Sequence, residues 1–122
     1  EEMFDMGTWG KTGYDHSLWQ PDVMILNCGT NDVPGGTTEE IMYCEGAKLL
    51  DKVRHAYPNA VILWMYGMMN ANFKNILQKL IDDRRQDDGK LNFPAGRRYL
   101  REERRGRRGG TSQRQRLCAR FS

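Results

Sequence analysis

The stretch Pro21–Asp32 reads PDVMILNCGTND and passes from apolar to polar residues within one short segment. Its apolar part, residues 23–26, is short and partly β-branched, which is typical of a strand covered on both faces of a parallel sheet. Gly29 ends this run, and Asn31 and Asp32 follow it in a polar turn. We therefore expect a buried strand that carries an Asn-Asp pair just beyond its carboxyl end.

A helix and a second strand are expected next. Thr37 can cap a helix, and Glu40, three residues later, can complete a capping box. Apolar residues then recur at helical spacing until Pro58, which disfavours a helical conformation at the residue before it. The run Ala60–Tyr66 (AVILWMY) matches the first apolar run in character, and Gly67 ends it. This run predicts a second strand like the first.

The clearest helical periodicity follows the second strand. Its apolar residues stand at positions i, i+3, i+4, i+7 and i+8: Phe73, Ile76, Leu77, Leu80 and Ile81. Residues 91–93 (LNF) indicate the start of a third strand. This alternation of strands and helices predicts an α/β layered parallel sheet with right-handed crossovers and helices on its faces. Ligands of such sheets bind beyond the carboxyl ends of the strands, where the turns 29–32 and 67–70 are expected to lie.

The composition divides the chain into three parts. The net charge is +3 over 122 residues, but residues 95–122 hold ten Arg and only two Glu, so the first 94 residues are acidic overall. We expect a loop over 1–20, one α/β domain over 21–93, and an Arg-rich tail over 94–122. The tail is interpreted as disordered or as the product of a shifted reading frame.

Other classes of protein find little support in the sequence. No apolar run approaches the ~20 residues of a membrane helix. The three cysteines lack the spacing of a zinc site, and Cys28 and Cys44 are interpreted as small core residues. The chain begins Glu-Glu, which leaves the cellular compartment open.

Two strings carry a resemblance to a known family. PDVMILNCGTND at Pro21–Asp32 and YPNAVILWMYGMM at Tyr57–Met69, with the capped helix between them, resemble the SGNH (GDSL-like) hydrolases. The second string is most similar to the carbohydrate-esterase branch, of the acetyl xylan esterase type. The resemblance covers about residues 21–93 and implies a three-layer flavodoxin-like parallel sheet, here incomplete.

The resemblance also implies a reaction and a site. Members of the family hydrolyse O-acyl esters with a serine nucleophile and a histidine base, so a small-molecule or carbohydrate ester is the expected substrate. Because this chemistry needs only side chains, neither a metal nor an organic cofactor is expected. By match to the family motif, Asn31 donates its side-chain amide to the oxyanion. We expect substrate-binding positions around it at Gly29, Thr30, Asp32, Gly67 and Met68. Asp32 has a second interpretation as a brace that accepts backbone N–H groups of its own loop.

The nucleophile and the base of this chemistry are not found in the sequence. The family's Gly-Asp-Ser block should lie well before Pro21, and its His-Pro pair near the C-terminus. Asp15-His16-Ser17 has the letters of a triad, but three successive residues cannot converge on one another. His55 is interpreted as a surface residue at the end of the first helix. The chain is therefore expected to be an inactive fragment of an esterase. Without the early strand, the faces of Val23, Ile25, Ile62 and Trp64 should be thinly covered, so the chain is expected to associate or aggregate.

Three further interpretations stay open. A one-base shift in degenerate codons for residues 110–121 permits GHPSASAYARVF, which contains the missing His-Pro pair. Alternatively the Arg-rich tail is a genuine arm that binds nucleic acid or another polyanion, although it has few stacking aromatics and nucleic acid is not the favoured partner. The domain is in a third interpretation a carbohydrate binder without catalytic activity.

Overall fold

The computed structural model describes residues 2–7, 10–11, 13–67 and 69–94. Its elements, in chain order, are the 3-10 helices η1 (Glu2–Asp5) and η2 (His16–Leu18), strand β1 (Val23–Asn27), the 3-10 helix η3 (Thr30–Asp32), helix α1 (Glu39–Ala56), strand β2 (Val61–Met65), helix α2 (Lys74–Arg85) and strand β3 (Leu91–Asn92). None of the helices in this part of the chain has the length and apolar character needed to cross a membrane. The tail beyond Pro94 lies outside the described residues, so its three interpretations, as a disordered segment, a frameshift product or a polyanion-binding arm, stay predictions.

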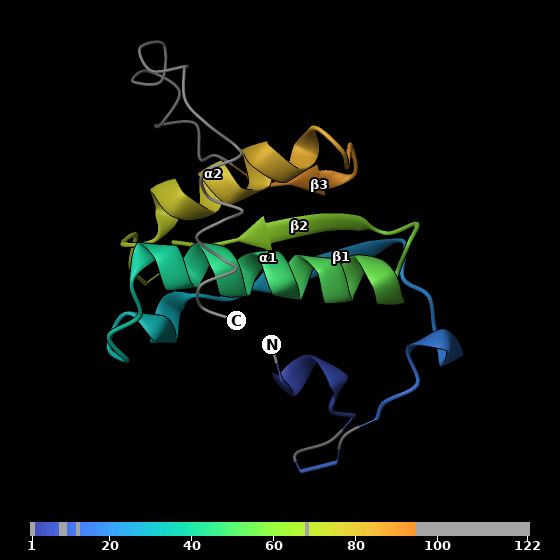
Figure 1. Cartoon of the computed structure of the whole chain (residues 1–122). Helices are drawn as coiled ribbons and strands as arrows, with labels where there is room; N and C mark the ends of the chain where they lie inside the picture. The colour runs from blue at the N-terminus through green and yellow to red at the C-terminus, as the bar shows by residue number, and fades with distance from the viewer. Residues whose placement is uncertain (1, 8–9, 12, 68, 95–122) are drawn as a thin grey trace.

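The three strands form one parallel sheet in the order β1-β2-β3 (Figure 1). Strand β2 is central, and it pairs with β1 from Val23 opposite Val61 to Asn27 opposite Met65. It pairs with β3 through Ile62 opposite Leu91. Each connection between neighbouring strands contains one long helix, which is how parallel strands are joined. The predicted α/β class and its parallel sheet are confirmed.

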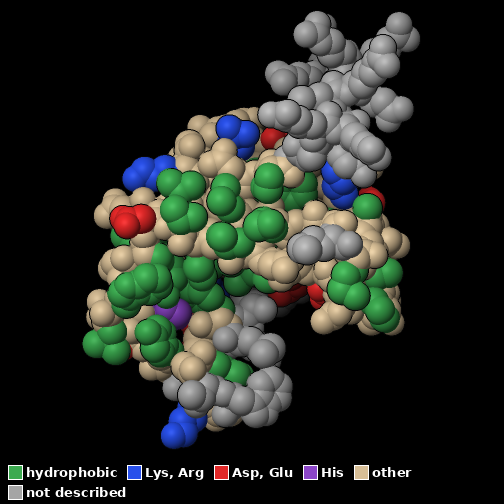
Figure 2. Space-filling view, turned by 180° about the vertical axis from the view of Figure 1, so that it is seen from behind, with side chains coloured by type: hydrophobic (Ala, Val, Ile, Leu, Met, Phe, Trp, Pro, Cys, Tyr) green, Lys and Arg blue, Asp and Glu red, His purple; other side chains and the backbone are tan. Residues whose placement is uncertain are grey.

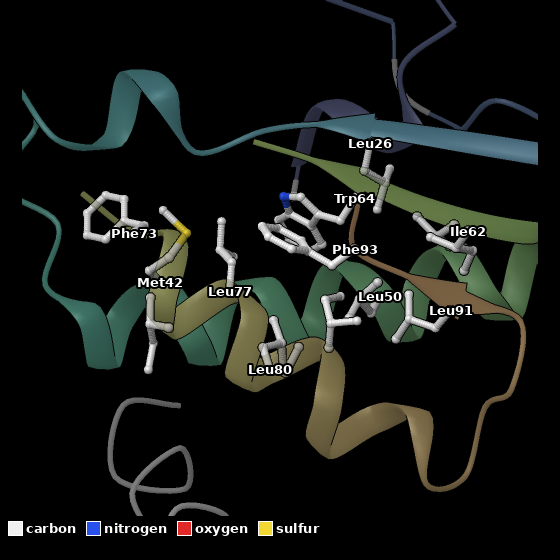
Figure 3. Packing of buried hydrophobic residues seen from close by; sticks show 14 of the residues in the cluster. Leu26, Met42, Leu50, Ile62, Trp64, Phe73, Leu77, Leu80, Leu91 and Phe93 are labelled. Carbon is white, nitrogen blue, oxygen red and sulfur yellow. The ribbon is translucent and has the colours of Figure 1, made fainter. Parts of the chain in front are cut away.

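Both long helices pack on the same face of the sheet (Figure 1). Ile62 and Trp64 of β2 point into this layer and are 0% and 1% exposed. Figure 3 shows them beside Leu26 of β1 and Leu77 of α2. All five residues of the periodicity found in the sequence of the second helix, 73–81, are buried here. The core is therefore a single layer between one sheet face and two helices.

The helix boundaries follow from local signals, with one shift from expectation. The N-cap of α1 is Thr38, whose Oγ1 accepts a hydrogen bond from the backbone N–H of Ile41 at 3.3 Å. The prediction of Thr37 as cap was wrong by one residue, and Glu40 then falls at the second helical position, where it cannot complete a capping box. At the other end the helix closes at Ala56, two residues before Pro58, as expected.

One arginine joins the elements that lead into β2 and β3. The guanidinium of Arg54, near the end of α1, donates to both carboxylate oxygens of Asp88, at 2.8 and 3.0 Å. It also donates to the backbone oxygen of Ala60, just before β2, at 2.7 Å. A bidentate pair of this kind fixes geometry as well as charge. The end of α1, the start of β2 and the turn before β3 are thereby held together.

The second face of the sheet is not covered by the described residues. Alternate residues of β1 and β2 point to it, and Val23 and Ile25 are 50% and 56% exposed. Figure 2 shows this side of the molecule, where hydrophobic side chains gather on the surface. The expectation that the first strand is covered on both faces was therefore wrong. The related expectation that Ile62 and Trp64 are thinly covered was also wrong, because they belong to the opposite, buried face.

Neighbouring residues of β1 provide a matched test of this asymmetry. Ile25→Thr keeps a β-branched residue on the open face while removing apolar surface, so we expect less self-association by light scattering and a free energy of unfolding within about 0.5 kcal/mol of the original. Leu26→Ala empties a core position and should cost about 2–5 kcal/mol. Equal losses of stability from the two changes, or an unaltered monomeric mass for both variants and the original chain, would contradict the one-sided sheet.

Candidate functional site

The turn after β1 is built on a glycine. Gly29 has φ of 111°, in the left-handed region that only glycine adopts readily, and it precedes the short helix η3 (Thr30–Asp32). The N–H of Asp32 donates to the backbone oxygen of Gly29 at 3.4 Å, and the N–H of Thr37 donates to the backbone oxygen of Asp32 at 3.2 Å. The chain therefore leaves the strand in a tight turn that carries Asn31 and Asp32 beyond the carboxyl end of the sheet.

Both polar side chains of this turn are exposed. The side-chain amide of Asn31 has no hydrogen-bond partner within the part of the chain that the structure describes. Its N–H groups are therefore available to an external acceptor. Within the same residues the carboxylate of Asp32 accepts no hydrogen bond either, so the interpretation of Asp32 as a brace of its own loop finds no support.

The turn after β2 lies at the same edge, as the parallel register requires. Gly67 is exposed there with φ of 103°, and Met68 lies outside the described residues. The interactions come instead from Tyr66 and Asn70. Asn70 donates through Nδ2 to the backbone oxygen of Thr30 at 3.1 Å and accepts the hydroxyl proton of Tyr66 through Oδ1 at 2.5 Å.

Sequence analysis located this second turn but missed the residues that carry its contacts. A Tyr and an Asn, four positions apart around a glycine, provide a donor, an acceptor and an amide, and that pattern is the signal available in the sequence. The partner of Asn70 lies in the turn after β1, because Thr30 is 40 residues earlier in the chain. Only the strand pairing brings the two turns together.

A cavity of about 290 Å³ lies between the turn after β1 and helix α1. Cys28, Gly29, Asp32, Thr37, Ile41, Met42, Glu45, Gly46, Leu49 and Trp64 line it. Although Cys28 as a whole residue is exposed, partial burial of its thiol raises the pKa of that group above the usual value, and the nearby Asp32 carboxylate raises it further. The thiol therefore stays protonated at neutral pH, which argues against Cys28 as a nucleophile. Cys28 is exposed, so its interpretation as a core residue was wrong, whereas Cys44 is buried as expected.

The histidines and the serine of the described residues lie away from this edge. Ser17 donates through both its backbone N–H and its hydroxyl to Asp15 Oδ1, at 2.9 and 2.6 Å. The ring of His16 does not face Ser17. Its Nδ1 is 2.7 Å from the hydroxyl oxygen of Tyr57, the residue that ends α1 at the amino side of β2. His55 is exposed in the last turn of α1. These residues do not form a triad with one another or with Asn31.

Comparison with known proteins places this edge in a wider context. No family model matches the sequence, and no curated protein matches it. Several solved structures are similar to it. An acetyl xylan esterase from the rumen bacterium Butyrivibrio proteoclasticus is 27% identical, with a TM-score of 0.58 over 67% of this chain and 29% of its own.

Two family two carbohydrate esterases are also similar. That from Clostridium thermocellum, an active-site mutant, is 22% identical with a TM-score of 0.67, over 75% of this chain and 31% of its own. That from Cellvibrio japonicus is 22% identical with a TM-score of 0.58, over 75% and 30%. These esterases have the SGNH hydrolase fold.

The described chain is part of an SGNH hydrolase fold. The resemblance inferred from the two strings is thereby confirmed, and the three solved structures described above are all carbohydrate esterases. The chain spans 29–31% of the length of these solved proteins. The Gly-Thr-Asn-Asp turn directly follows β1, which pairs with β2. The carboxyl edge of this strand pair is therefore the candidate site.

A pair of glycine substitutions tests the geometry of the turn. Gly29→Ala requires a left-handed alanine and brings its Cβ to 3.0 Å from Tyr66 Cε2, so we expect a loss of about 1–3 kcal/mol in the free energy of unfolding. Gly35→Ala is the control, because its Cβ meets nothing nearer than 3.5 Å and the residue has no positive φ. Chemical denaturation measures both, and equal stability of the two variants would contradict the described turn.

Proposed function

We propose that this chain is part of a serine esterase of the SGNH type that hydrolyses O-acyl esters, and that Asn31 is a donor of its oxyanion hole. The observation that carries the proposal is the side-chain amide of Asn31, which has no hydrogen-bond partner among the described residues and lies beyond the carboxyl edge of the parallel sheet, in a chain with this fold. Ligands of parallel α/β sheets bind at that edge. The match of Asn31 to the Asn of the family's Gly-x-Asn-Asp block gives the residue its role.

The physical basis is the charge that develops during acyl transfer. When a nucleophile adds to an ester carbonyl, negative charge accumulates on the former carbonyl oxygen. A neutral amide donor fixed in advance binds that charge more strongly than it binds the ester, so it lowers the barrier. An amide that spends its N–H groups on its own loop could not do so, and the amide of Asn31 is not spent in this way within the described residues.

The substrate that we propose is an acetyl ester on a carbohydrate. This choice is supported by the solved neighbours, an acetyl xylan esterase and two carbohydrate esterases. Gly29, Thr30, Asp32, Gly67 and Met68 are proposed to border the substrate, since they flank Asn31 in sequence or belong to the adjoining turn. The serine nucleophile and histidine base of the mechanism are proposed to come from outside residues 21–93.

The first prediction from this proposal concerns the 122-residue chain itself. Because Ser17 and His16 face the amino side of the sheet, we expect no release of acetate from acetylated xylan above the buffer blank. Binding without hydrolysis would instead favour the carbohydrate-binder interpretation. Acetate release that disappears on Ser17→Ala would contradict the proposed site.

The role of Asn31 is tested in a hybrid enzyme. Residues 21–93 would replace the aligned segment of an active form of the Clostridium thermocellum esterase, which supplies nucleophile and base. We expect the hybrid to release acetate, and Asn31→Ala to lower kcat by about 100- to 1000-fold. Asn75→Ala is the matched control, because Asn75 is an exposed asparagine on α2, and it should leave kcat unchanged. A folded, active hybrid whose kcat does not depend on Asn31 would overturn the oxyanion assignment.

A further inference from the structure

The three residues that immediately precede Asn31 are each held by a different side chain from β2 or the turn after it. Trp64 holds Cys28, Tyr66 packs on Gly29, and Asn70 holds Thr30. We propose that Trp64, Tyr66 and Asn70 are positioning residues, which fix the backbone before Asn31 so that its amide is presented in one orientation. This proposal rests on the proposed function of Asn31, which it deepens.

The first contact comes from the core. The indole of Trp64 is 1% exposed and packed against the buried layer (Figure 3), so it is rigid. Its Nε1–H donates to the backbone oxygen of Cys28 at 3.3 Å. A buried indole N–H needs an acceptor, and here the acceptor is the carbonyl at the exit of β1. The end of that strand is thereby fixed to the hydrophobic core.

The second contact is steric. The ring of Tyr66 lies against Gly29 so closely that a Cβ there would stand 3.0 Å from Cε2 and 3.2 Å from Cδ2. A side chain at position 29 would therefore force the Tyr66 ring to shift by a few tenths of an ångström. The left-handed conformation of Gly29 and this close approach therefore both favour glycine at this position, on two independent grounds.

The third contact is a directed chain of hydrogen bonds. The backbone N–H of Phe73 donates to the hydroxyl oxygen of Tyr66 at 3.2 Å, and the Tyr66 hydroxyl donates in turn to Oδ1 of Asn70. This acceptor role assigns the amide of Asn70, so that its Nδ2 is the group that faces the backbone oxygen of Thr30 at 3.1 Å. These three hydrogen bonds link the start of α2, through Tyr66 and Asn70, to the peptide just before Asn31.

These contacts matter because Asn31 cannot orient itself. Its side chain is exposed and makes no hydrogen bond within the described residues, so its order must come from the backbone that carries it. The carbonyl of Thr30 belongs to the peptide plane shared with Asn31. Holding that carbonyl restricts the direction of the Asn31 Cα–Cβ bond. Preorganisation of this kind is what makes a donor stabilise a transition state without reorganising during the reaction.

The test measures the mobility of Asn31 in the full chain by ¹⁵N relaxation. Asn70→Asp keeps an acceptor for Tyr66 but removes the donor to Thr30, and Tyr66→Phe removes the hydroxyl that orients Asn70. For both variants we expect the backbone order parameter of Asn31 to fall from about 0.85 to below about 0.6, relative to α2 residues in the same sample. The control is Tyr43→Phe, which removes another part-buried hydroxyl bond, to Asp83 at 2.8 Å, between the two long helices.

The outcomes separate local positioning from general stability. A fall confined to residues 29–33 in Asn70→Asp and Tyr66→Phe, absent in Tyr43→Phe at comparable unfolding midpoints, supports the proposal. An unchanged order parameter at Asn31 in both variants, or a fall spread over all elements, overturns it. No substrate is needed, so an ordered loop in this experiment with no dependence of kcat on Asn31 in the hybrid enzyme would reject the proposed function and leave the positioning contacts intact.

Discussion

The parallel pairing of β1 with β2 is the constraint on which the rest of this structure depends. Its register sets Leu26 beside Trp64 and Asn27 beside Met65, so the two strands end together. Two turns that are far apart in the sequence therefore emerge at one edge. Without this pairing, Asn70 could not reach the backbone oxygen of Thr30, and the peptide just before Asn31 would lose this hydrogen bond.

The same pairing divides the sheet into unequal faces. The face with Ile62 and Trp64 is closed by α1 and α2, whereas the face with Val23 and Ile25 is exposed. Parallel sheets are normally buried on both faces, because their crossover helices cover them. Here both described crossovers lie on one side. The described part of the chain is therefore stabilised by a single apolar layer, together with the ion pair of Arg54 with Asp88 near the starts of β2 and β3.

Much of this arrangement could be predicted from the sequence where local signals are strong. The periodicity over 73–81 and the two apolar runs specify helix and strands, and their alternation specifies a parallel sheet. Which face is open could not be predicted, because Ile25 and Leu26 look alike as residues and differ only in what packs on them. The same limit applies to Asn70 and to the loop of Cys28, whose partners come from distant parts of the chain. The family motif was enough to single out Asn31 as a candidate, whereas the contacts that support its turn are seen only in the structure.

The central claim is that Asn31 projects from the edge of a parallel sheet, with a side-chain amide that no other described residue binds. A nuclear Overhauser spectrum of the labelled chain addresses this claim most directly. The account predicts cross-strand contacts in the register that pairs Leu26 with Trp64. It also predicts that the side-chain amide protons of Asn31 exchange with water and are not protected by a hydrogen bond to their own turn. A shifted or antiparallel register, or Asn31 amide protons protected by the turn from which they come, would contradict it.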